Sequence, residues 1–118
     1  MLEANLNLVI SIYNMDKRER MFLSSNREYF VCPKIMVQED TTNINTLLLS
    51  LVNDCAVIKN NYRPLFQLLS VNKNNNELNI NYATMLPSDT TIKLDKAYLT
   101  SYNIAVIDTT VRKALSYV

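Results

Sequence analysis

The sequence predicts a single α+β domain over residues 1–118, in which a mixed β-sheet is sandwiched between helices. Three observations lead to this fold class. Residues 43–56 have the apolar periodicity of an amphipathic helix, and the segments on both sides of them have the composition of strands. Residues 108–118 have the capping residue and apolar spacing of a second helix. A sheet of this size needs such helices to cover its apolar faces.

The helix over 43–56 is the clearest element. Its apolar residues fall at i, i+3, i+4, i+7, i+8 and i+11, which places them on one face of a 3.6-residue period: Ile44, Leu47, Leu48, Leu51, Val52 and Cys55. The preceding cluster Thr41-Thr42-Asn43 offers N-cap residues, whose side chains accept hydrogen bonds from the first turn. We therefore expect this helix to pack its apolar face on the sheet.

The remaining elements are short strands separated by Asn-, Ser- and Pro-containing turns. In chain order the expected strands are Leu6–Tyr13, Arg20–Ser24, Glu28–Cys32, Ile35–Val37, Leu65–Val71, Glu77–Leu86, Thr91–Leu94 and Lys96–Thr100. The first two form a hairpin, as do the strands on either side of residues 72–76. Asp108 is the expected N-cap of the terminal helix, which places Val111, Leu115 and Val118 on one side.

Composition excludes several functional classes. A net charge of +1 gives no global case for binding nucleic acid or acidic substrates. No apolar run approaches the roughly 20 residues of a membrane span, and Glu3 stands where an export signal would be positive. Cys32 and Cys55 are too far apart for a metal motif, so we expect buried, reduced thiols in a cytoplasmic protein. A composition rich in Asn, Lys and Ile is typical of AT-rich genomes such as those of many phages. For a phage protein, the expected compartment is the host cytoplasm.

The chain contains no His and no Gly. Without His there is no imidazole base, no imidazole metal ligand and no Ser-His or Cys-His pair. Without Gly the glycine-rich phosphate loops are excluded. Positions with positive φ must then fall to other residues, of which Asn is the usual substitute. Asn is abundant where turns are expected: Asn14, Asn26, Asn60-Asn61 and Asn74-Asn75-Asn76.

The order of elements, with a short strand and Pro33-Lys34-Ile35 leading into the helix, resembles the Nudix fold over most of the chain. The family signature is a Gly, five residues, a Glu, seven residues, then Arg-Glu-apolar-x-Glu-Glu-x-Gly-apolar. In that family the helix glutamates ligate Mg²⁺ or Mn²⁺, and the metals polarise a pyrophosphate and activate water. The resemblance therefore implies a fold, and an activity that depends on those carboxylates.

The signature can be placed on this chain in a consistent register, but most of its carboxylates are missing. Ile35 takes the first Gly position and Thr41 the first Glu. Leu49-Ser50 replaces Arg-Glu, and Asn53-Asp54 replaces Glu-Glu. The remaining equivalences keep only apolar character: Leu51 at the apolar position, Ala56 at the last Gly and Val57 at the end. Only Asp54 keeps a carboxylate, so this register predicts a pseudoenzyme with no metal and no cofactor.

Two groups of charged residues are candidate sites with ordinary alternatives. Glu39 and Asp40 could join Asp54 in a rearranged metal site, or could cap the helix N-terminus from the surface. A locally basic segment interleaved with Phe22, Tyr29 and Phe30 could bind an anion, RNA or a partner: Lys17, Arg18, Arg20, Arg27 and Lys34. Acidic residues within the segment weaken its positive electrostatic potential. The alternative is therefore that these residues belong to an ordinary solvated hairpin with no binding role.

Three functional hypotheses follow. The first is a non-catalytic binding domain that contacts a protein partner as an accessory or regulatory factor. The second is nucleotide or RNA binding without hydrolysis, with Arg27 and Lys34 as contacts. The third is a metal-dependent nucleoside-diphosphate-type phosphohydrolase that uses Glu39, Asp40 and Asp54. No hypothesis places the chain in a membrane, and the oligomeric state stays open.

Overall fold

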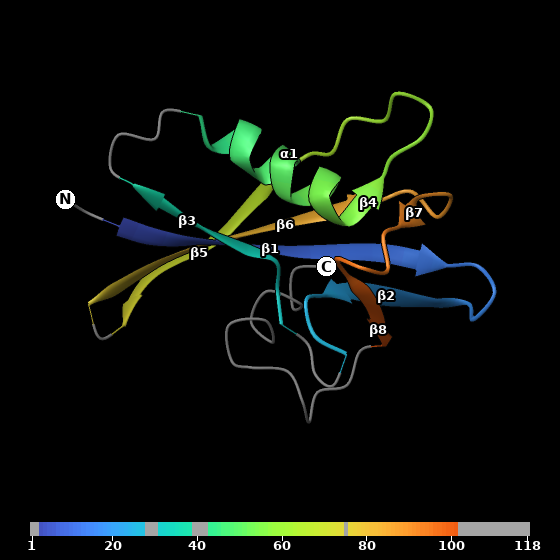
Figure 1. Ribbon diagram of the computed structural model, residues 1–118, viewed down its shortest axis with the longest axis horizontal. Helices are drawn as coiled ribbons and strands as arrows, with labels where there is room; N and C mark the ends of the chain where they lie inside the picture. The colour runs from blue at the N-terminus through green and yellow to red at the C-terminus, as the bar shows by residue number, and fades with distance from the viewer. Residues whose placement is uncertain (1–2, 28–30, 39–42, 75, 102–118) are drawn as a thin grey trace.

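A computed structural model describes residues 3–27, 31–38, 43–74 and 76–101. In this part of the chain a twisted sheet carries one α-helix on one face (Figure 1). The helix is α1 (Ile44–Cys55). The strands are β1 (Glu3–Asn14), β2 (Glu19–Ser24), β3 (Lys34–Gln38), β4 (Ala56–Val57), β5 (Gln67–Asn74), β6 (Glu77–Leu86), β7 (Thr91–Ile92) and β8 (Tyr98–Ser101). Within the described residues, no helix is both long enough and apolar enough to cross a membrane.

The main sheet is mixed, as predicted. Its strand order is β5-β6-β1-β2-β8, and β3 pairs with the first half of β1. Strands β1 and β6 run parallel in register from Ala4 opposite Leu78 to Ile12 opposite Leu86. The pairs β1–β2, β1–β3, β2–β8 and β5–β6 are antiparallel. Strand β6 pairs along one edge of β1. The other edge of β1 is shared by β3 and β2, which pair with its first and last residues in turn. A separate two-stranded sheet pairs β4 with β7.

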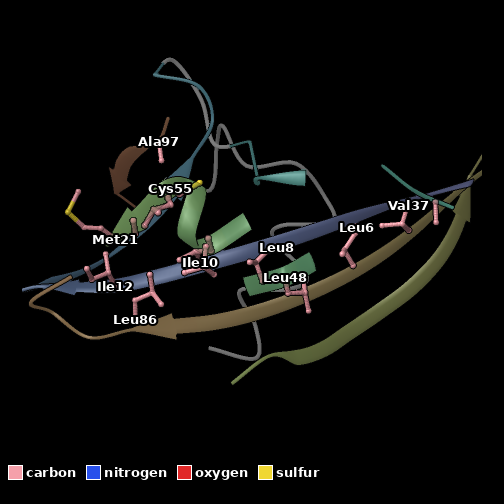
Figure 2. Close-up of a cluster of buried hydrophobic side chains, with 14 residues drawn as sticks. Leu6, Leu8, Ile10, Ile12, Met21, Val37, Leu48, Cys55, Leu86 and Ala97 are labelled. Carbon is pink, nitrogen blue, oxygen red and sulfur yellow. The ribbon is translucent and has the colours of Figure 1, made fainter. Parts of the chain in front are cut away.

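The main core lies between α1 and the sheet. Alternate residues of β1 point toward the helix and are buried: Leu6, Leu8, Ile10 and Ile12. The helix contributes Leu48, Val52 and Cys55 as buried residues, while the flanking Ile44, Leu47 and Leu51 are partly buried and pack against the same core. Figure 2 shows Leu48 next to Leu8 in this cluster, with Ile10 further along β1. The predicted apolar face of the helix and the alternation of β1 are therefore confirmed.

The opposite face of the sheet combines a small apolar cluster with a network of amides. Val9, Phe22, Cys32 and Ala83 are buried there. Toward the start of β1, Asn7 Nδ2 donates to Asn81 Oδ1 at 2.9 Å. Asn81 Nδ2 in turn donates to Ser70 Oγ at 3.0 Å, and only 1% of Asn81 is exposed. A buried amide is stable when its hydrogen bonds are made, which explains how the polar side of β6 can be buried.

Several predicted boundaries are wrong. Residues 31–33 form no strand, while the rest of the expected strand Glu28–Cys32 lies outside the described residues. Ala56 is extended (φ −154°, ψ 156°) and belongs to β4 instead of α1. The cause is Lys93, whose backbone N–H donates to Cys55 O at 2.9 Å and takes the place of a further helical turn. The terminal helix expected from Asp108 also lies outside the described residues.

Four other strands have bounds that shift by two or three residues, and the first is β1, which begins at Glu3 instead of the expected Leu6. The expected strand Leu65–Val71 begins only at Gln67, where Thr84 Oγ1 donates to the carbonyl of Leu65 at 2.8 Å just before the ladder. It also continues to Asn74, so residues 72–74 belong to β5 and not to the expected turn. The expected strand Thr91–Leu94 shortens to Thr91–Ile92, and Lys96–Thr100 becomes Tyr98–Ser101. By contrast, the expected bounds of Glu77–Leu86 are confirmed.

The role predicted for Asn at positive φ is confirmed at three of the named positions, whereas Asn14, Asn26 and Asn74 do not have positive φ. Among the described residues, positive φ occurs at Asn60, Asn61, Asn76 and Arg18. Asn76 lies in the turn of the β5–β6 hairpin, and Asn60 and Asn61 lie in the loop that leads from β4 toward β5. Asn tolerates the left-handed region better than other non-Gly residues, which explains how tight turns form in a chain without Gly. Arg18, in the β1–β2 turn, was not anticipated.

Candidate functional site

The first candidate site is a hollow between the outer side of α1 and the start of β3. It has a volume of about 470 Å³ and is lined by Lys34, Ile35, Ser50, Leu51, Asn53, Asp54 and Lys93. We call it the signature pocket. Ser50, Asn53 and Asp54 lie on the solvent side of α1, opposite Leu48 and Val52. The three positions where a Nudix helix would carry glutamates therefore line one pocket, together with Ile35 on the strand side.

Lys93 shapes the helix end of this pocket. Its Nζ donates to Asn53 O at 2.7 Å, and its backbone N–H donates to Cys55 O at 2.9 Å. The last four carbonyls of a helix lack partners within the helix, and Lys93 satisfies two of them. Its positive charge also lies at the negative end of the helix dipole. The pocket thus carries an ammonium that has a structural role in ending α1.

The donor set of the signature pocket does not fit a divalent metal. Asp54 is the one carboxylate in its lining, and Lys34 and Lys93 contribute two positive charges. Mg²⁺ and Mn²⁺ are held by several carboxylate or carbonyl oxygens, and a lone short carboxylate beside two ammonium groups does not supply them. Among the described residues, no group of three or more His, Cys, Asp or Glu is placed to hold a metal. Glu39 and Asp40 lie outside the described residues.

Cys55 is the last residue of α1 and follows Asp54, which lines the pocket. Its side chain is buried, and burial raises the pKa of the Cys55 thiol above its ordinary value. The negative charge of Asp54 raises this pKa further, and the positive charge of Lys93 lowers it in part. Nucleophilic thiols need a lowered pKa, so Cys55 has the character of a structural, protonated thiol. Cys32 is also a buried thiol that forms no disulfide, as predicted.

The five predicted basic residues do not form one patch. Lys17 and Arg18 lie at the β1–β2 turn, beyond Asn14. Lys34 pairs with Asn7, seven residues earlier on β1, which corresponds to about 23 Å along the strand.

The other two basic residues are engaged within the fold. Arg20 Nη1 donates to Ser11 Oγ at 3.2 Å, and the Arg27 guanidinium lies 4.8 Å from the centre of the Tyr98 ring. Of the five, only Lys34 lines the signature pocket.

A second candidate site was missed by the sequence analysis. Two hollows, of about 600 and 290 Å³, adjoin each other and share Tyr62, Leu65 and Phe66 in their linings. Leu49 of α1 lines the larger hollow and Met85 of β6 the smaller. We call these five residues the Tyr62 surface. Leu65 is 84% exposed, and Leu49, Tyr62 and Met85 are also exposed. Such adjoining exposed apolar groups mark interaction surfaces.

The loop that presents the Tyr62 surface is fixed to the body of the domain. Tyr62 Oη donates to Met85 O at 3.0 Å, and Thr84 Oγ1 donates to Leu65 O at 2.8 Å. Asn60 Nδ2 donates to Asp89 Oδ2 at 3.1 Å. A surface held this way loses little conformational freedom when a partner binds. No pattern in the sequence marks this surface, because Leu65 and Phe66 directly precede a strand, where an exposed leucine cannot be told from a buried one.

The fold resembles that of a solved Nudix domain. No protein-family profile matches the chain, and no curated protein matches it significantly. Among solved structures, it is similar to the NUDIX domain of Shewanella oneidensis NrtR, which was crystallised with ADP ribose. The TM-score is 0.63 at 12% sequence identity, and the match covers 99% of this chain and 88% of that chain. At this identity the similarity extends to the fold alone, so the α+β architecture of this chain is Nudix-like.

Proposed function

We propose that this chain is a non-hydrolysing Nudix-like binding domain, a pseudoenzyme that acts as an accessory or regulatory factor by contacting a protein. The observation that supports this proposal is the composition of the signature pocket. Its glutamate positions hold Ser50, Asn53 and Asp54, and Lys93 adds a cation at the same helix end. Hydrolysis of a pyrophosphate by this fold requires metals, and an ammonium beside a single carboxylate disfavours binding a second cation there.

The Tyr62 surface supports a protein as the partner. It combines an exposed tyrosine with exposed aliphatic side chains around two hollows, and Tyr is enriched at protein interfaces. Aromatic and aliphatic anchors that fill pockets contribute most of the binding energy at such interfaces. A partner that covers Leu65 would remove from water a side chain that the fold itself leaves 84% exposed.

A nucleotide bound without hydrolysis is the second candidate. Lys34 and Lys93 give the signature pocket two ammonium groups suited to phosphate oxygens. The NrtR NUDIX domain, which shares the fold, was crystallised with ADP ribose. Calorimetric titration with ADP ribose tests this candidate: binding by the wild type that Lys34→Ala weakens would favour it. RNA binding with a steep salt dependence would favour the RNA form of the same hypothesis.

Hydrolysis is tested by incubating the full chain with ADP ribose and nucleoside diphosphates in the presence of Mg²⁺ or Mn²⁺. The proposal expects no metal-dependent cleavage above a protein-free control. Metal-dependent cleavage that is lost in Asp54→Asn and in a Glu39→Gln/Asp40→Asn double variant would contradict the proposal. It would instead favour the phosphohydrolase that uses those three carboxylates.

Partner binding is tested by affinity capture with the tagged full chain after nuclease treatment. Leu65→Asp places a charge on the Tyr62 surface, and Val57→Asp is the matched control, because Val57 is 49% exposed on β4 outside that surface. We expect one protein to be captured by the wild type and by the Val57 variant, but not by the Leu65 variant. If both variants captured the protein equally well, the Tyr62 surface would not be the site that binds the partner.

A further inference from the structure

Strand β5 (Gln67–Asn74) is an edge strand of the main sheet in the part of the chain that the structure describes. It stands at the end of the strand order, with β6 on one side and no described strand on the other (Figure 1). It follows directly from the loop that carries Tyr62, Leu65 and Phe66. The free backbone groups of an edge strand can pair with an extended segment of another chain, and this is a recurring mode of peptide recognition.

A β-bulge gives this edge an apolar side. The register against β6 shifts between Leu68 and Ser70, so Leu68 lies opposite Tyr82 and Val71 lies opposite Ile80. Leu68 and Val71 are three residues apart, so they would face opposite sides of a regular strand. The extra residue in the bulge places both of them on the helix side of the sheet. They are 52% and 56% exposed. The strip formed by Leu68 and Val71 therefore extends the apolar character of the Tyr62 surface along β5.

Positive charges flank this strip and no negative charge lies in it. Residues 67–74 contain no carboxylate, while Lys73 lies near the far end of β5 and Arg63 lines the larger hollow at the near end. No described residue forms an ion pair with Arg63 or Lys73. A complementary segment would be apolar in the middle and acidic at its ends.

We propose that β5 binds an extended segment of the partner protein, with alternating apolar residues and carboxylates at both ends. The segment adds a strand to the sheet along β5, which spans about 26 Å, and directs carboxylates to Arg63 and Lys73. This inference rests on the proposed function, since it describes how the protein partner is held. A second copy of this chain is a poorer occupant, because another β5 brings no carboxylate to either cation.

The probe for this site is a fluorescein-labelled peptide, Asp-Glu-Val-Thr-Val-Thr-Val-Glu, blocked at its other end. Its control replaces each acidic residue with Lys. Fluorescence anisotropy is expected to show binding of the acidic peptide to the wild type, and an affinity about tenfold lower for Arg63→Glu and for Val71→Glu. Val57→Glu, on exposed β4, is the matched control and is expected to bind like the wild type. Arg63→Glu is expected to prefer the Lys peptide.

Hydrogen exchange provides the second readout. Addition of a strand is expected to slow exchange of backbone amides in residues 67–74, whereas contact by side chains alone would leave them unchanged. No binding of the acidic peptide at about 1 mM, or equal binding by wild type and Arg63→Glu, would overturn the inference. A captured partner that also binds Val71→Glu equally well would overturn it and leave the proposed function intact. Metal-dependent hydrolysis would instead contradict the proposed function.

Discussion

Substitution of Leu48 by Ala tests the rotational setting of α1. Leu48 is fully buried against β1, whereas its neighbour Leu49 is 40% exposed and lines the larger hollow. The substitution removes three carbon atoms from the core. At about 0.8 kcal/mol for each buried carbon the transfer loss is roughly 2.4 kcal/mol, and the cavity brings the total to about 3 kcal/mol. In Leu49→Ala, the same three carbons leave a partly exposed site, so we expect a loss below about 1 kcal/mol.

Urea denaturation followed by circular dichroism measures both variants. We expect Leu48→Ala to lower the midpoint while the slope stays unchanged, and a thermal midpoint about 12 °C lower, at about 4 °C per kcal/mol for a domain of this size. Leu49→Ala is expected to change capture of the partner more than stability. Equal destabilisation by the two variants, or a larger loss for Leu49, would mean that α1 is rotated by about 100°, one residue. That rotation would also remove Ser50, Asn53 and Asp54 from the signature pocket.

Three further predictions concern the ends of α1. Asn43→Ala removes the side-chain oxygen that accepts from Thr46 N–H at 3.1 Å, and we expect it to lower the free energy of unfolding by about 1 kcal/mol in urea denaturation. Asn43→Asp is expected to be as stable as the wild type, and an unchanged midpoint in Asn43→Ala would contradict the capping role. Lys93→Met leaves the carbonyl of Asn53 without its Nζ donor and is expected to lower the free energy of unfolding by roughly 0.5–1 kcal/mol in the same assay. The loss is expected to be smaller at high salt, and a loss that does not depend on salt would contradict an interaction between the Lys93 charge and the helix dipole. Because the pKa of Cys55 is raised on folding, the unfolded thiol ionises first as pH rises. Stability is expected to fall from about pH 8 to pH 10 more steeply in the wild type than in Cys55→Ala, and equal slopes would contradict this.

Periodicity was sufficient to predict the sheet and the one helix layer that the structure describes. The six apolar positions of residues 43–56 identify the buried face of α1 because a helix repeats every 3.6 residues. The alternation of Leu6, Leu8 and Ile10 identifies the helix side of β1 in the same way. Both patterns are local in the sequence, so they identify the buried faces even when the residues that pack against them are unknown. The mixed sheet and the confirmed β5–β6 hairpin follow from the order of these elements.

Features set by contacts distant in sequence could not be predicted. Ala56 leaves the helix because the backbone N–H of Lys93, 37 residues later, donates to the carbonyl of Cys55. The burial of Asn81 depends on Asn7 and Ser70, and its sequence context only marks it as the polar side of a strand. The bulge that turns Leu68 and Val71 to one side is likewise a property of the β5–β6 pairing.

The candidate site was predictable in part. The register of the signature places Ser50, Asn53 and Asp54 around one pocket, as the resemblance implied. Lys93 was not anticipated, because nothing in residues 91–96 indicates that its ammonium reaches the end of α1. The basic residues near the N-terminus are close in sequence, but β1 separates Lys17 and Arg18 from Lys34. Sequence proximity is a poor guide to a surface patch when an extended strand lies between its members.

The central claim is that the signature pocket performs no metal chemistry, and the most direct measurement is a Mn²⁺ titration of the full chain followed by ¹H–¹⁵N NMR. A Mn²⁺ ion in the pocket would broaden the amide signals of Ile35, Ser50, Asn53 and Asp54 before those of residues elsewhere. We expect no selective broadening of these signals at one equivalent of Mn²⁺. Selective broadening that Asp54→Asn abolishes would contradict the account and restore a metal site to this helix.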